Sequence, residues 1–337
     1  KIRCAVLFVK FARTGAYMDL LSCYSHPIDD YSLDVFALHS ATQGKPLQWV
    51  GMTLFVHNNL LEEFNIQQQT LENFLREIEG LYHSENQYHN NIHAADVTWS
   101  MHILLLRGGL LQTLTKLELF SCLLSAIIHD CDHPGHTNGY LISISDPLAI
   151  LHNDRSVLEN HHCSISFEVS RRPHCNIFEG LTTQQYKQTR SLIIDLVLGT
   201  DFGQHRVLMR KIEDLAKRGW PKEERDDRFL MALLTLKCSD LGHGAKEFRL
   251  HQEWSRRVTE EFLAQGDREK ELNLPVSSGM DRNVVRLETS QYQFLSTAIL
   301  PLFTLYASKF SGCQPQVEQI QKNIQVWAQS IKELNLL

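Results

Sequence analysis

Apolar residues along this chain recur mostly at helical spacing. Leu71, Phe74, Leu75, Ile78 and Leu81 follow the i, i+3, i+4, i+7 pattern that the buried face of an α-helix produces. Long alternation of apolar and polar residues, as in a half-buried strand, is missing, and no Asn-Gly hairpin turn joins two such runs. The pattern therefore predicts an all-α chain, whose later helices cover residues 291–309 and 317–332.

Three further segments are predicted to be helices of the core. Thr115 and Glu118 have the spacing of a capping box at the start of segment 115–128, which continues as a nearly apolar run. Segments 183–198 and 228–238 end in equally apolar runs, and we expect both to be buried helices with little polar face. Because no internal repeat, low-complexity tract or Gly/Ser-rich linker divides the sequence, we expect a single compact multi-helix domain.

The composition is that of an ordinary soluble globular protein. Of the 337 residues 43% are hydrophobic and 21% are charged, with 33 Lys and Arg against 39 Asp and Glu. The formal net charge of -6 argues against non-specific binding of nucleic acid or of an anionic membrane, which requires a basic face. The net charge does not exclude an anionic small-molecule substrate, because a site that holds metal ions sets its own local potential.

The cysteines are scattered, and no Cys-x-x-Cys pair occurs among them. They are Cys4, Cys23, Cys122, Cys131, Cys163, Cys175, Cys238 and Cys313. In a chain of this length we expect reduced core cysteines of a cytosolic protein rather than a disulfide framework. No apolar segment approaches the ~20 residues that span a bilayer, so no direct membrane insertion is expected. The first residues lack an initiator Met and a signal-like cleavage site, and we expect a fragment of a longer protein.

Two of the nearly apolar segments end in acidic residues. Segment 123–133 reads LLSAIIHDCDH and segment 230–240 reads LMALLTLKCSD, which places Asp130 and Asp240 at the ends of predicted core helices. A buried carboxylate is costly unless it is paired or coordinates a cation. A third segment, YHNNIHAAD at 88–96, spaces His89 and His93 four residues apart, which predicts that both lie on one helix face.

Together these three segments indicate a shared metal site. Imidazole and carboxylate groups suit zinc, and carboxylate groups with water suit magnesium or manganese. Each feature alone has a simpler interpretation: a helix-end His is usually a cap or a hydrogen-bonded core residue, and an Asp-x-Asp pair is usually an exposed turn. Asp240 alone could be a helix C-terminal acid that meets the next N-terminus. Their joint occurrence favours the metal site.

At these residues the sequence resembles the catalytic domain of class I 3′,5′-cyclic nucleotide phosphodiesterases. YHNNIHAADV at 88–97 and HDCDHPG at 129–135 look like the two signatures of that family. Further blocks match in the same order: SVLENHH at 156–162, LGTD at 198–201, KCSDL at 237–241, WSRRVTEEFLAQGDREK at 254–270, MDR at 280–282 and SQYQF at 290–294. The resemblance implies one catalytic domain over residues 1–337, with a core at about 50–310, in the all-α fold of the wider HD-type metal phosphohydrolase superfamily.

The resemblance also implies a two-metal centre. It implies that a zinc ion is ligated by His93, His129, Asp130 and Asp240. Asp130 would bridge to a second ion, magnesium or alternatively manganese, whose other ligands are mostly waters. A second set of residues would hold those waters: His133, Glu159 and Thr200. Two cations bridged by one water lower the pKa of that water from ~16 towards neutrality and offset charge that builds on phosphorus.

The resemblance implies that His89 is the general acid. The leaving 3′-oxygen of a cyclic nucleotide must receive a proton, and a protonated imidazole can supply it near pH 7. Its spacing of one helical turn from His93 directs His89 towards the same centre. A fifth metal ligand and a structural histidine are the alternative roles for this residue.

The resemblance places a purine pocket in the C-terminal half. Its residues would be Gln291 at the purine edge, Phe294 and Val258 on the two faces, Trp254 as a support, and His243 nearby. An amide side chain both donates and accepts, so Gln291 can pair with adenine or, after rotation, with guanine. Phe294, three residues further on, would share its helix face and stack on the base, although a plain core aromatic fits the same pattern.

Two residues of this region depart from the family pattern. His243 stands where members specialised for cyclic AMP often carry Asn, and His251 stands where several relatives carry a Tyr that orients the glutamine. A loosely held Gln291 would favour acceptance of both nucleotides. Segment 277–282 also replaces the commoner Ser-Pro start of its block. These departures leave the metal chemistry untouched and the choice between cyclic AMP and cyclic GMP open.

The leading hypothesis is a cytosolic enzyme that hydrolyses cyclic AMP, and also cyclic GMP, to the 5′-monophosphate by means of a two-metal-activated hydroxide. A different HD-type metal-dependent nucleotide phosphohydrolase would keep the four metal ligands, but has no reason to keep His89, Gln291 and Phe294 together. A nucleotide-sensing module with a purely structural metal is a third hypothesis. Structural zinc sites are usually closed by four Cys-rich ligands, whereas this one has spare carboxylates. Oligomeric state is not indicated by the sequence.

Overall fold

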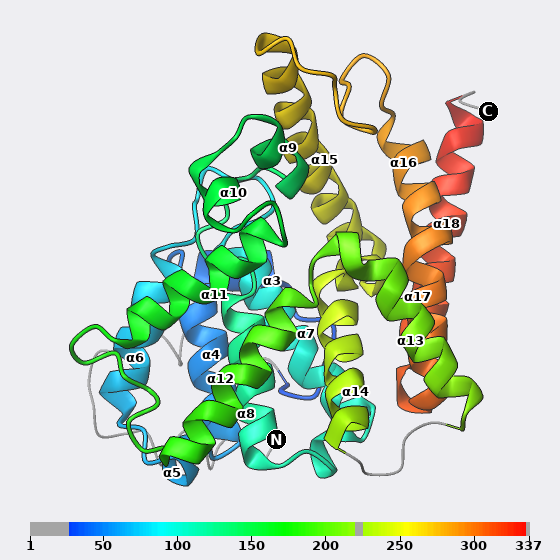
Figure 1. Ribbon diagram of the computed structural model, residues 1–337. Coiled ribbons are helices and arrows are strands. Elements are labelled where there is room, and N and C mark those ends of the chain that lie inside the picture. Colours follow the sequence, from blue (N-terminus) through cyan, green and yellow to red (C-terminus); the bar gives the residue numbers. More distant parts are fainter. Residues whose placement is uncertain (1–26, 220–224, 335–337) are drawn as a thin grey trace.

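The chain folds into helices, as the apolar spacing predicts. The computed structural model describes residues 27–219 and 225–334, and no strand occurs within these two ranges (Figure 1). The α-helices are α3 (Val35–Ala41), α4 (Pro46–His57), α5 (Leu60–Glu63), α6 (Gln68–Glu79), α7 (Asn91–Arg107), α8 (Lys116–Ile128), α9 (Asn138–Ser143), α10 (Pro147–Leu151), α11 (Val157–Ser170), α12 (Thr183–Leu198), α13 (His205–Lys217), α14 (Arg225–Asp240), α15 (Phe248–Glu271), α16 (Leu287–Phe294), α17 (Leu300–Lys309) and α18 (Gln314–Glu333). Short 3-10 helices are η1 (Leu110–Gln112), η2 (Phe202–Gln204), η3 (Gly242–Ala245) and η5 (Ser311–Cys313), and η4 (Leu295–Ile299) is a π-helical turn.

Helix α7 runs through the centre of the molecule. Every residue from Ile92 to Leu105 is buried, because α4, α8 and α14 pack around it. Because α7 is buried on all sides, it has no separate polar face, and its polar residues, such as Thr98 and Ser100, are buried together with the apolar ones. Helices α16, α17 and α18 lie side by side at one edge of the molecule, and α4 and α6 lie at the opposite edge (Figure 1).

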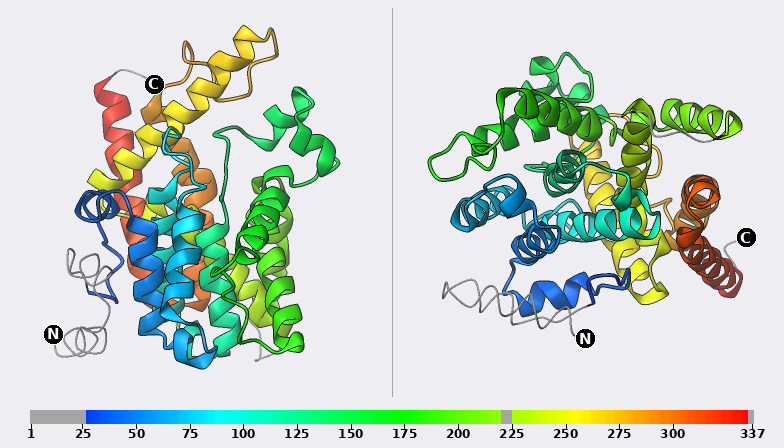
Figure 2. Two further views of the ribbon diagram at one scale, coloured as in Figure 1. Left: turned by 90° about the vertical axis from the view of Figure 1, so that its left-hand side faces the viewer. Right: turned by 90° about the horizontal axis from the view of Figure 1, so that it is seen from below.

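Helices α9 and α10 form an outlying pair above α11 (Figure 2). They have a small hydrophobic cluster of their own, made by Tyr140, Leu141, Ala149, Val157 and Leu158. Because Val157 and Leu158 open α11, this cluster positions the first turn of that helix. Glu159, one of the predicted site residues, lies in that turn.

The predicted core helices are present, with one correction. The capping box of Thr115 and Glu118 opens α8, and the residues from Met231 to Ser239 of α14 are all buried. The prediction that segment 183–198 has little polar face is wrong. Helix α12 packs against α8, α11 and α14, and its remaining face, which includes Ser191 and Asp195, is exposed.

The helix predicted over residues 291–309 is interrupted. It consists of α16, the π-helical turn Leu295–Ile299 and α17. Pro301, near the start of α17, has no backbone N–H to donate to the carbonyl four residues earlier, and the π-helical turn lies at this point of the helix. Gln291 and Phe294 both lie in α16, on one face as predicted.

The described cysteines are free and buried, as expected for core residues. They are Cys122, Cys131, Cys163, Cys175, Cys238 and Cys313. Cys4 and Cys23 lie outside the described residues, as does the chain start to which the expectation of a fragment refers. None of the helices in the two described ranges has the length and apolar character that crossing a membrane requires.

Candidate active site

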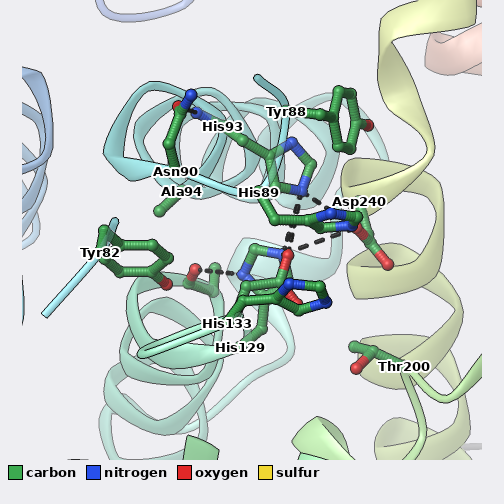
Figure 3. Close-up of polar contacts among 12 residues, drawn as sticks. Tyr82, Tyr88, His89, Asn90, His93, Ala94, His129, His133, Thr200 and Asp240 are labelled. Atoms are coloured by element: carbon green, nitrogen blue, oxygen red, sulfur yellow. Dashed lines mark hydrogen bonds and ion pairs between the residues drawn. The ribbon is translucent and has the colours of Figure 1, made fainter. Parts of the chain in front are cut away.

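The N-terminal end of α7 meets the C-terminal ends of α8 and α14 at a cluster of two histidines and two aspartates (Figure 3). His93 lies in the first turn of α7, His129 caps α8 and precedes Asp130, and Asp240 ends α14. The Nε2 atom of each histidine lies 3.1–3.5 Å from an oxygen of each aspartate, and the two Nε2 atoms are 3.2 Å apart. The structure thus brings together the four residues that were predicted to bind the first metal ion.

The spacing of these four donor atoms fits one cation. Ligand atoms at about 2.0–2.2 Å from a tetrahedral ion lie about 3.3–3.6 Å from one another, close to the observed 3.1–3.5 Å. The Nδ1 atom of His129 donates to the carbonyl oxygen of Ala126 at 2.9 Å, which orients the ring so that its Nε2 is the atom that faces the cluster. Two imidazole nitrogens and two carboxylate oxygens are therefore a chemically suitable donor set for a divalent cation.

The charges at this site are those that a cation needs. Burial alone would raise the pKa of Asp130 and of Asp240, but the neighbouring His129 lowers both pKa values far below the usual range. Both carboxylates therefore stay ionised at neutral pH. The C-terminal ends of α8 and α14 also point their negative dipole ends at the site, which further favours a cation.

His89 does not lie on α7, and the prediction that it shares a helix face with His93 is wrong. The side-chain oxygen of Asn90 accepts hydrogen bonds from two backbone N–H groups of the first helical turn, at 3.0 and 3.3 Å. Asn90 is thus the N-cap, and His89 precedes the helix. The ring of His89 nevertheless lies 5.8 Å from that of His93, centroid to centroid, and it stacks on the ring of His133 at 4.0 Å.

The Nδ1 atom of His89 forms a hydrogen bond with a carboxylate oxygen of Glu261 on α15. The other oxygen of Glu261 accepts the backbone N–H groups of Tyr88 and His89 at 2.8 and 3.1 Å. Burial alone would lower the pKa of His89, but the charge and hydrogen bond of Glu261 outweigh it and raise that pKa to about 9. Conversely, His89 overcomes the effect of burial on Glu261 and lowers its pKa to about 2. The pair therefore holds a protonated imidazole beside the metal-ligand cluster at neutral pH.

A second group of possible ligands adjoins the first. Side-chain atoms of Asp130, His133 and His162 all lie within 4.8 Å of one another. Oδ2 of Asp130 faces His93 and His129, whereas its Oδ1 lies 3.8 Å from Nε2 of His162. Asp130 thus presents one carboxylate oxygen to each group, as a bridging ligand must.

The loop of residues 129–135 is fixed from two sides. The amide nitrogen of Asn86 donates to the backbone oxygens of His89 and His133, at 2.9 and 2.7 Å, and so ties the two loops together. Gly135 has a φ of +73°, and a Cβ at that position would come 2.6 Å from Oδ1 of Asn86, so only glycine fits the turn. On the other side, Asp132 receives hydrogen bonds from His83 and His161, each at 2.7 Å.

Glu159 and Thr200, which were predicted to hold waters of the second ion, contact other residues. The carboxylate of Glu159 accepts the side-chain amide of Asn138 at 3.0 Å, and burial raises its pKa to about 7. The hydroxyl of Thr200 donates to the carbonyl of Val197 at 2.8 Å, and the side chain lies apart from the dashed contacts in Figure 3. Their role in holding waters stays a prediction, as does that of His133.

The predicted purine residues come from α15, η3 and α16. Gln291 is buried, and its side-chain oxygen accepts the hydroxyl of Ser255 at 3.0 Å. Phe294 and Val258 are partly buried against the core, and the ring of Phe294 lies nearly parallel to that of His243 at a centroid distance of 6.5 Å. The purine pocket, and a sandwich of a base between Phe294 and Val258, stay predictions.

Trp254 lies between this region and the metal ligands. Its ring packs edge-on against Tyr88 at 5.4 Å and against His93 at 5.9 Å. Because it is almost fully buried, it fixes the position of the loop that carries His89. The contacts of Trp254 described here are with Tyr88 and His93, and its predicted support of the purine pocket stays a prediction.

Three site residues were not singled out from the sequence: Glu261, His162 and Ser255. Glu261 lies two helical turns after Trp254, so the same-face spacing i, i+7 on α15 could have indicated it. His162 lies three residues after Glu159, on the same face of α11. For Ser255 the sequence holds no comparable signal, because its contact with Gln291 spans 36 residues.

Comparison with known proteins identifies what this chain is similar to. Residues 88–320 match the family model described as 3′5′-cyclic nucleotide phosphodiesterase. A probable 3′,5′-cyclic-AMP phosphodiesterase pde-4 of Caenorhabditis elegans is 35% identical over 318 residues, which are 92% of this chain and 47% of the relative. A dual specificity calcium/calmodulin-dependent 3′,5′-cyclic nucleotide phosphodiesterase 1 of Drosophila melanogaster is 39% identical over 81% of this chain and 33% of the relative. The chain thus spans less than half the length of either relative.

Two solved structures have the same fold. The structure of LmjPDEB1 in complex with IBMX has a TM-score of 0.88 and 29% identity, over 96% of this chain and 99% of that one. The phosphodiesterase domain of the RhoPDE fusion protein from the choanoflagellate Salpingoeca rosetta has a TM-score of 0.86 and 27% identity, over 95% of this chain and all of that one. The helical arrangement described above is therefore shared over almost the whole length of these domains.

Proposed function

The chain belongs to the 3′,5′-cyclic nucleotide phosphodiesterase family, and on this premise we propose that it hydrolyses cyclic AMP, and also cyclic GMP, to nucleoside 5′-monophosphates. One observation carries the proposal. A four-residue metal-ligand cluster lies directly beside a histidine that a buried glutamate keeps protonated. Such a site combines the groups that assist attack on phosphorus with the group that protonates the leaving oxygen.

The metal part of the proposal assigns zinc to His93, His129, Asp130 and Asp240. A mixed set of imidazole and carboxylate ligands supports this choice. We assign magnesium, or manganese, to the side of Asp130 that faces His133 and His162, because few protein ligands and space for waters suit these ions. When bound, the two ions would supply Lewis acidity that lowers the pKa of a water and offsets negative charge at phosphorus.

The residues that surround the second ion would act through water. Glu159, in the first turn of α11, is partly buried and accepts the side-chain amide of Asn138, and Thr200 follows the end of α12. In the proposal they, with His133, accept or donate hydrogen bonds to waters and so keep them oriented. Carboxylate, hydroxyl and imidazole groups are suited to this task, because each can bond a water without displacing it.

His89 would act as the general acid. Glu261 holds its Nδ1, so the proton on Nε2 is available to the leaving 3′-oxygen. Its side chain is 20% exposed, whereas those of His93 and His129 are 3% and 0% exposed, so of these three His89 is the most accessible from outside. Because its Nδ1 is occupied by Glu261, a role as a fifth ligand is less well supported.

The base would be held by Gln291. Its amide can present either its oxygen or its nitrogen to the purine edge, and Phe294 and Val258 would cover the two faces. The proposed location is the cytosol, where free buried cysteines such as the six described here are the rule. We also propose that residues 1–337 form one catalytic domain, with its core at about residues 50–310.

The test compares substrates. Purified protein with added Zn²⁺ and Mg²⁺ should hydrolyse cyclic AMP and cyclic GMP, and leave dGTP intact. Preferred hydrolysis of dGTP would favour a different HD-type phosphohydrolase, and no turnover of any substrate would favour a sensor. The variant His89→Ala separates catalysis from metal binding, because the proposal predicts a loss of turnover with unchanged metal content.

A further inference from the structure

Lys237 is a buried cation in an otherwise apolar part of α14. It lies in the last turn of that helix, ahead of Asp240, and it is 1% exposed. A buried ammonium group is costly unless hydrogen bonds satisfy it. Its Nζ atom donates to the backbone oxygen of Thr200 at 2.6 Å and to that of Asp201 at 3.3 Å. Lys237 thus joins the end of α14 to the segment that follows α12.

The end of α12 lies directly against α14 at this point. Helix α12 ends at its C-cap Gly199, and a Cβ at that position would lie 2.3 Å from Cδ1 of Leu233 on α14, so glycine allows the close approach. Lys237 follows Leu233 by one helical turn and lies on the same face of α14. The C-terminal end of a helix also favours a nearby cation, because it carries the negative end of the helix dipole. Packing and charge together therefore hold the residues after α12 at one position along α14.

Asp201 extends this link to α11. Its carboxylate accepts the hydroxyl of Ser156 and the backbone N–H of Gly203, each at 2.8 Å. Ser156 is the N-cap residue of α11, and its φ of +41° lies in the left-handed region that serine seldom adopts. Glu159 lies in the first turn of the same helix. The hydrogen bond between Ser156 and Asp201 therefore holds the start of α11, and Glu159 with it, against the segment that Lys237 anchors.

We propose that Lys237 is a positioning residue for the second metal ion. The inference rests on the proposed function, in which Thr200 and Glu159 hold waters of that ion. Lys237 holds the backbone of Thr200 directly, and through Asp201 it holds the start of α11. One helical turn further along α14 lies Asp240, a proposed ligand of the first ion. One buried side chain therefore fixes the residues that hold these waters relative to the ligands of the first ion.

The two ions depend on Lys237 to different degrees. The first ion would be bound directly by four side chains, none of which receives a hydrogen bond from Lys237. An ion such as magnesium keeps several of its waters, so its affinity depends on the groups that orient them. Outer partners of this kind typically contribute about 10–100-fold to metal affinity. Loss of the Lys237 hydrogen bonds should therefore weaken the second ion and leave the first in place.

The test measures metal binding directly and uses Lys237→Met, which keeps an unbranched side chain but removes the donor. Zinc-loaded protein is titrated with Mn²⁺, and the free Mn²⁺ is followed by electron paramagnetic resonance. We expect the dissociation constant for Mn²⁺ to rise about tenfold or more in the variant, the effect of an outer partner of a metal site. The zinc content by elemental analysis should equal that of the wild type.

A second variant and a control separate this role from a structural one. Ser156→Ala, at a partly buried position, breaks only the link to α11, and the dissociation constant for Mn²⁺ should rise about fivefold, the effect of one hydrogen bond. In the double variant the rise should be smaller than the product of the two single rises, because both changes act on one link. Lys116→Met removes a lysine that donates to the backbone oxygen of Asn58 at 2.8 Å, at the opposite end of α8 from the metal-ligand cluster. It should leave the Mn²⁺ affinity unchanged.

The outcomes are distinct. An unchanged Mn²⁺ affinity in Lys237→Met, with or without a lowered melting temperature, would overturn the inference while cyclic nucleotide hydrolysis stands, and so would a parallel loss of zinc. If Lys237→Met does not fold, an unchanged Mn²⁺ affinity in Ser156→Ala would overturn it. A wild-type protein that binds no Mn²⁺ beside zinc would overturn the assignment of the second ion and the inference with it. Failure of the wild-type protein to hydrolyse any cyclic nucleotide would instead overturn the proposed function.

Discussion

The substitution Glu261→Gln tests the proposed general acid most directly. Gln keeps an oxygen that can accept the backbone N–H groups of Tyr88 and His89, but it removes the negative charge next to the imidazole. Glu261 is the main reason that the pKa of His89 is raised from 6.5 to about 9 against the effect of burial. That rise corresponds to about 3 kcal/mol of interaction in favour of the protonated ring.

The expected result is a shift of the alkaline limb of the pH profile. An acid works only while it is protonated, so activity is present below the pKa of His89 and is lost as the pH rises through it. Without the charge of Glu261, burial is opposed mainly by the charges of Asp130 and Asp240, so the pKa of His89 is lower than in the wild type and fewer rings are protonated at pH 7.5. We therefore expect kcat/KM at pH 7.5 to fall about tenfold or more, with partial recovery below pH 6.5. Bound cations would lower the pKa of His89 in the wild type and in Glu261→Gln alike. The prediction therefore concerns the difference between these two proteins.

The same charge pair affects stability. Because the pKa of His89 is raised in the folded state, its contribution to the free energy of unfolding is complete below about pH 6.5 and is lost as the pH rises through about 9. Thermal unfolding of the wild type and of Glu261→Gln should therefore differ most below pH 6.5 and converge at high pH. Glu260→Gln, which alters an exposed neighbour paired with Arg282, is the matched control. An alkaline limb that is the same in wild type and Glu261→Gln would refute the assignment of Glu261.

Three further predictions concern other parts of the site. Asp240→Ala should lose bound zinc and activity together, and normal zinc content by elemental analysis would remove Asp240 from the ligand set. Gln291→Ala should raise KM for both cyclic nucleotides with unchanged metal content, and unaltered kinetics would place the base elsewhere. Asn90→Ala removes the N-cap of α7, so chemical denaturation should show a free energy of unfolding about 1 kcal/mol lower, with the loss of activity greater than for the matched cap variant Thr115→Ala on α8.

The meeting of His93, His129, Asp130 and Asp240 in one cluster could be predicted from the sequence for a simple physical reason. Asp130 and Asp240 end segments that are otherwise apolar, and an ionised carboxylate at such a position requires a partner. Helix boundaries at capping residues were equally predictable where the cap was recognised, as at Thr115. The cap at Asn90 was not recognised, and His89 was therefore placed on a helix that begins after it.

The contacts between distant segments, such as the one that raises the pKa of His89, could not be predicted in the same way. Glu261 reaches His89 across 172 residues of chain, because α15 crosses beside the loop that precedes α7. Spacing within one helix carries no information about such crossings. The hydrogen bond from Trp327 on α18 to His251 on α15, and the contact of His251 with His243 in η3, likewise join separate elements that only the packed structure brings together.

The convergence of three helix ends on four ligands has a consequence for folding. His93 lies in the first turn of α7, and the other three proposed ligands lie at the ends of α8 and α14, so the cluster exists only when these helices have docked. An ion that binds this cluster and not the unfolded chain raises the free energy of unfolding, by about 2.7 kcal/mol at a free concentration one hundred times its dissociation constant. Chelation should thus weaken the interior of the bundle as well as stop turnover, since Asp130 and Asp240 would then repel each other in the same small space.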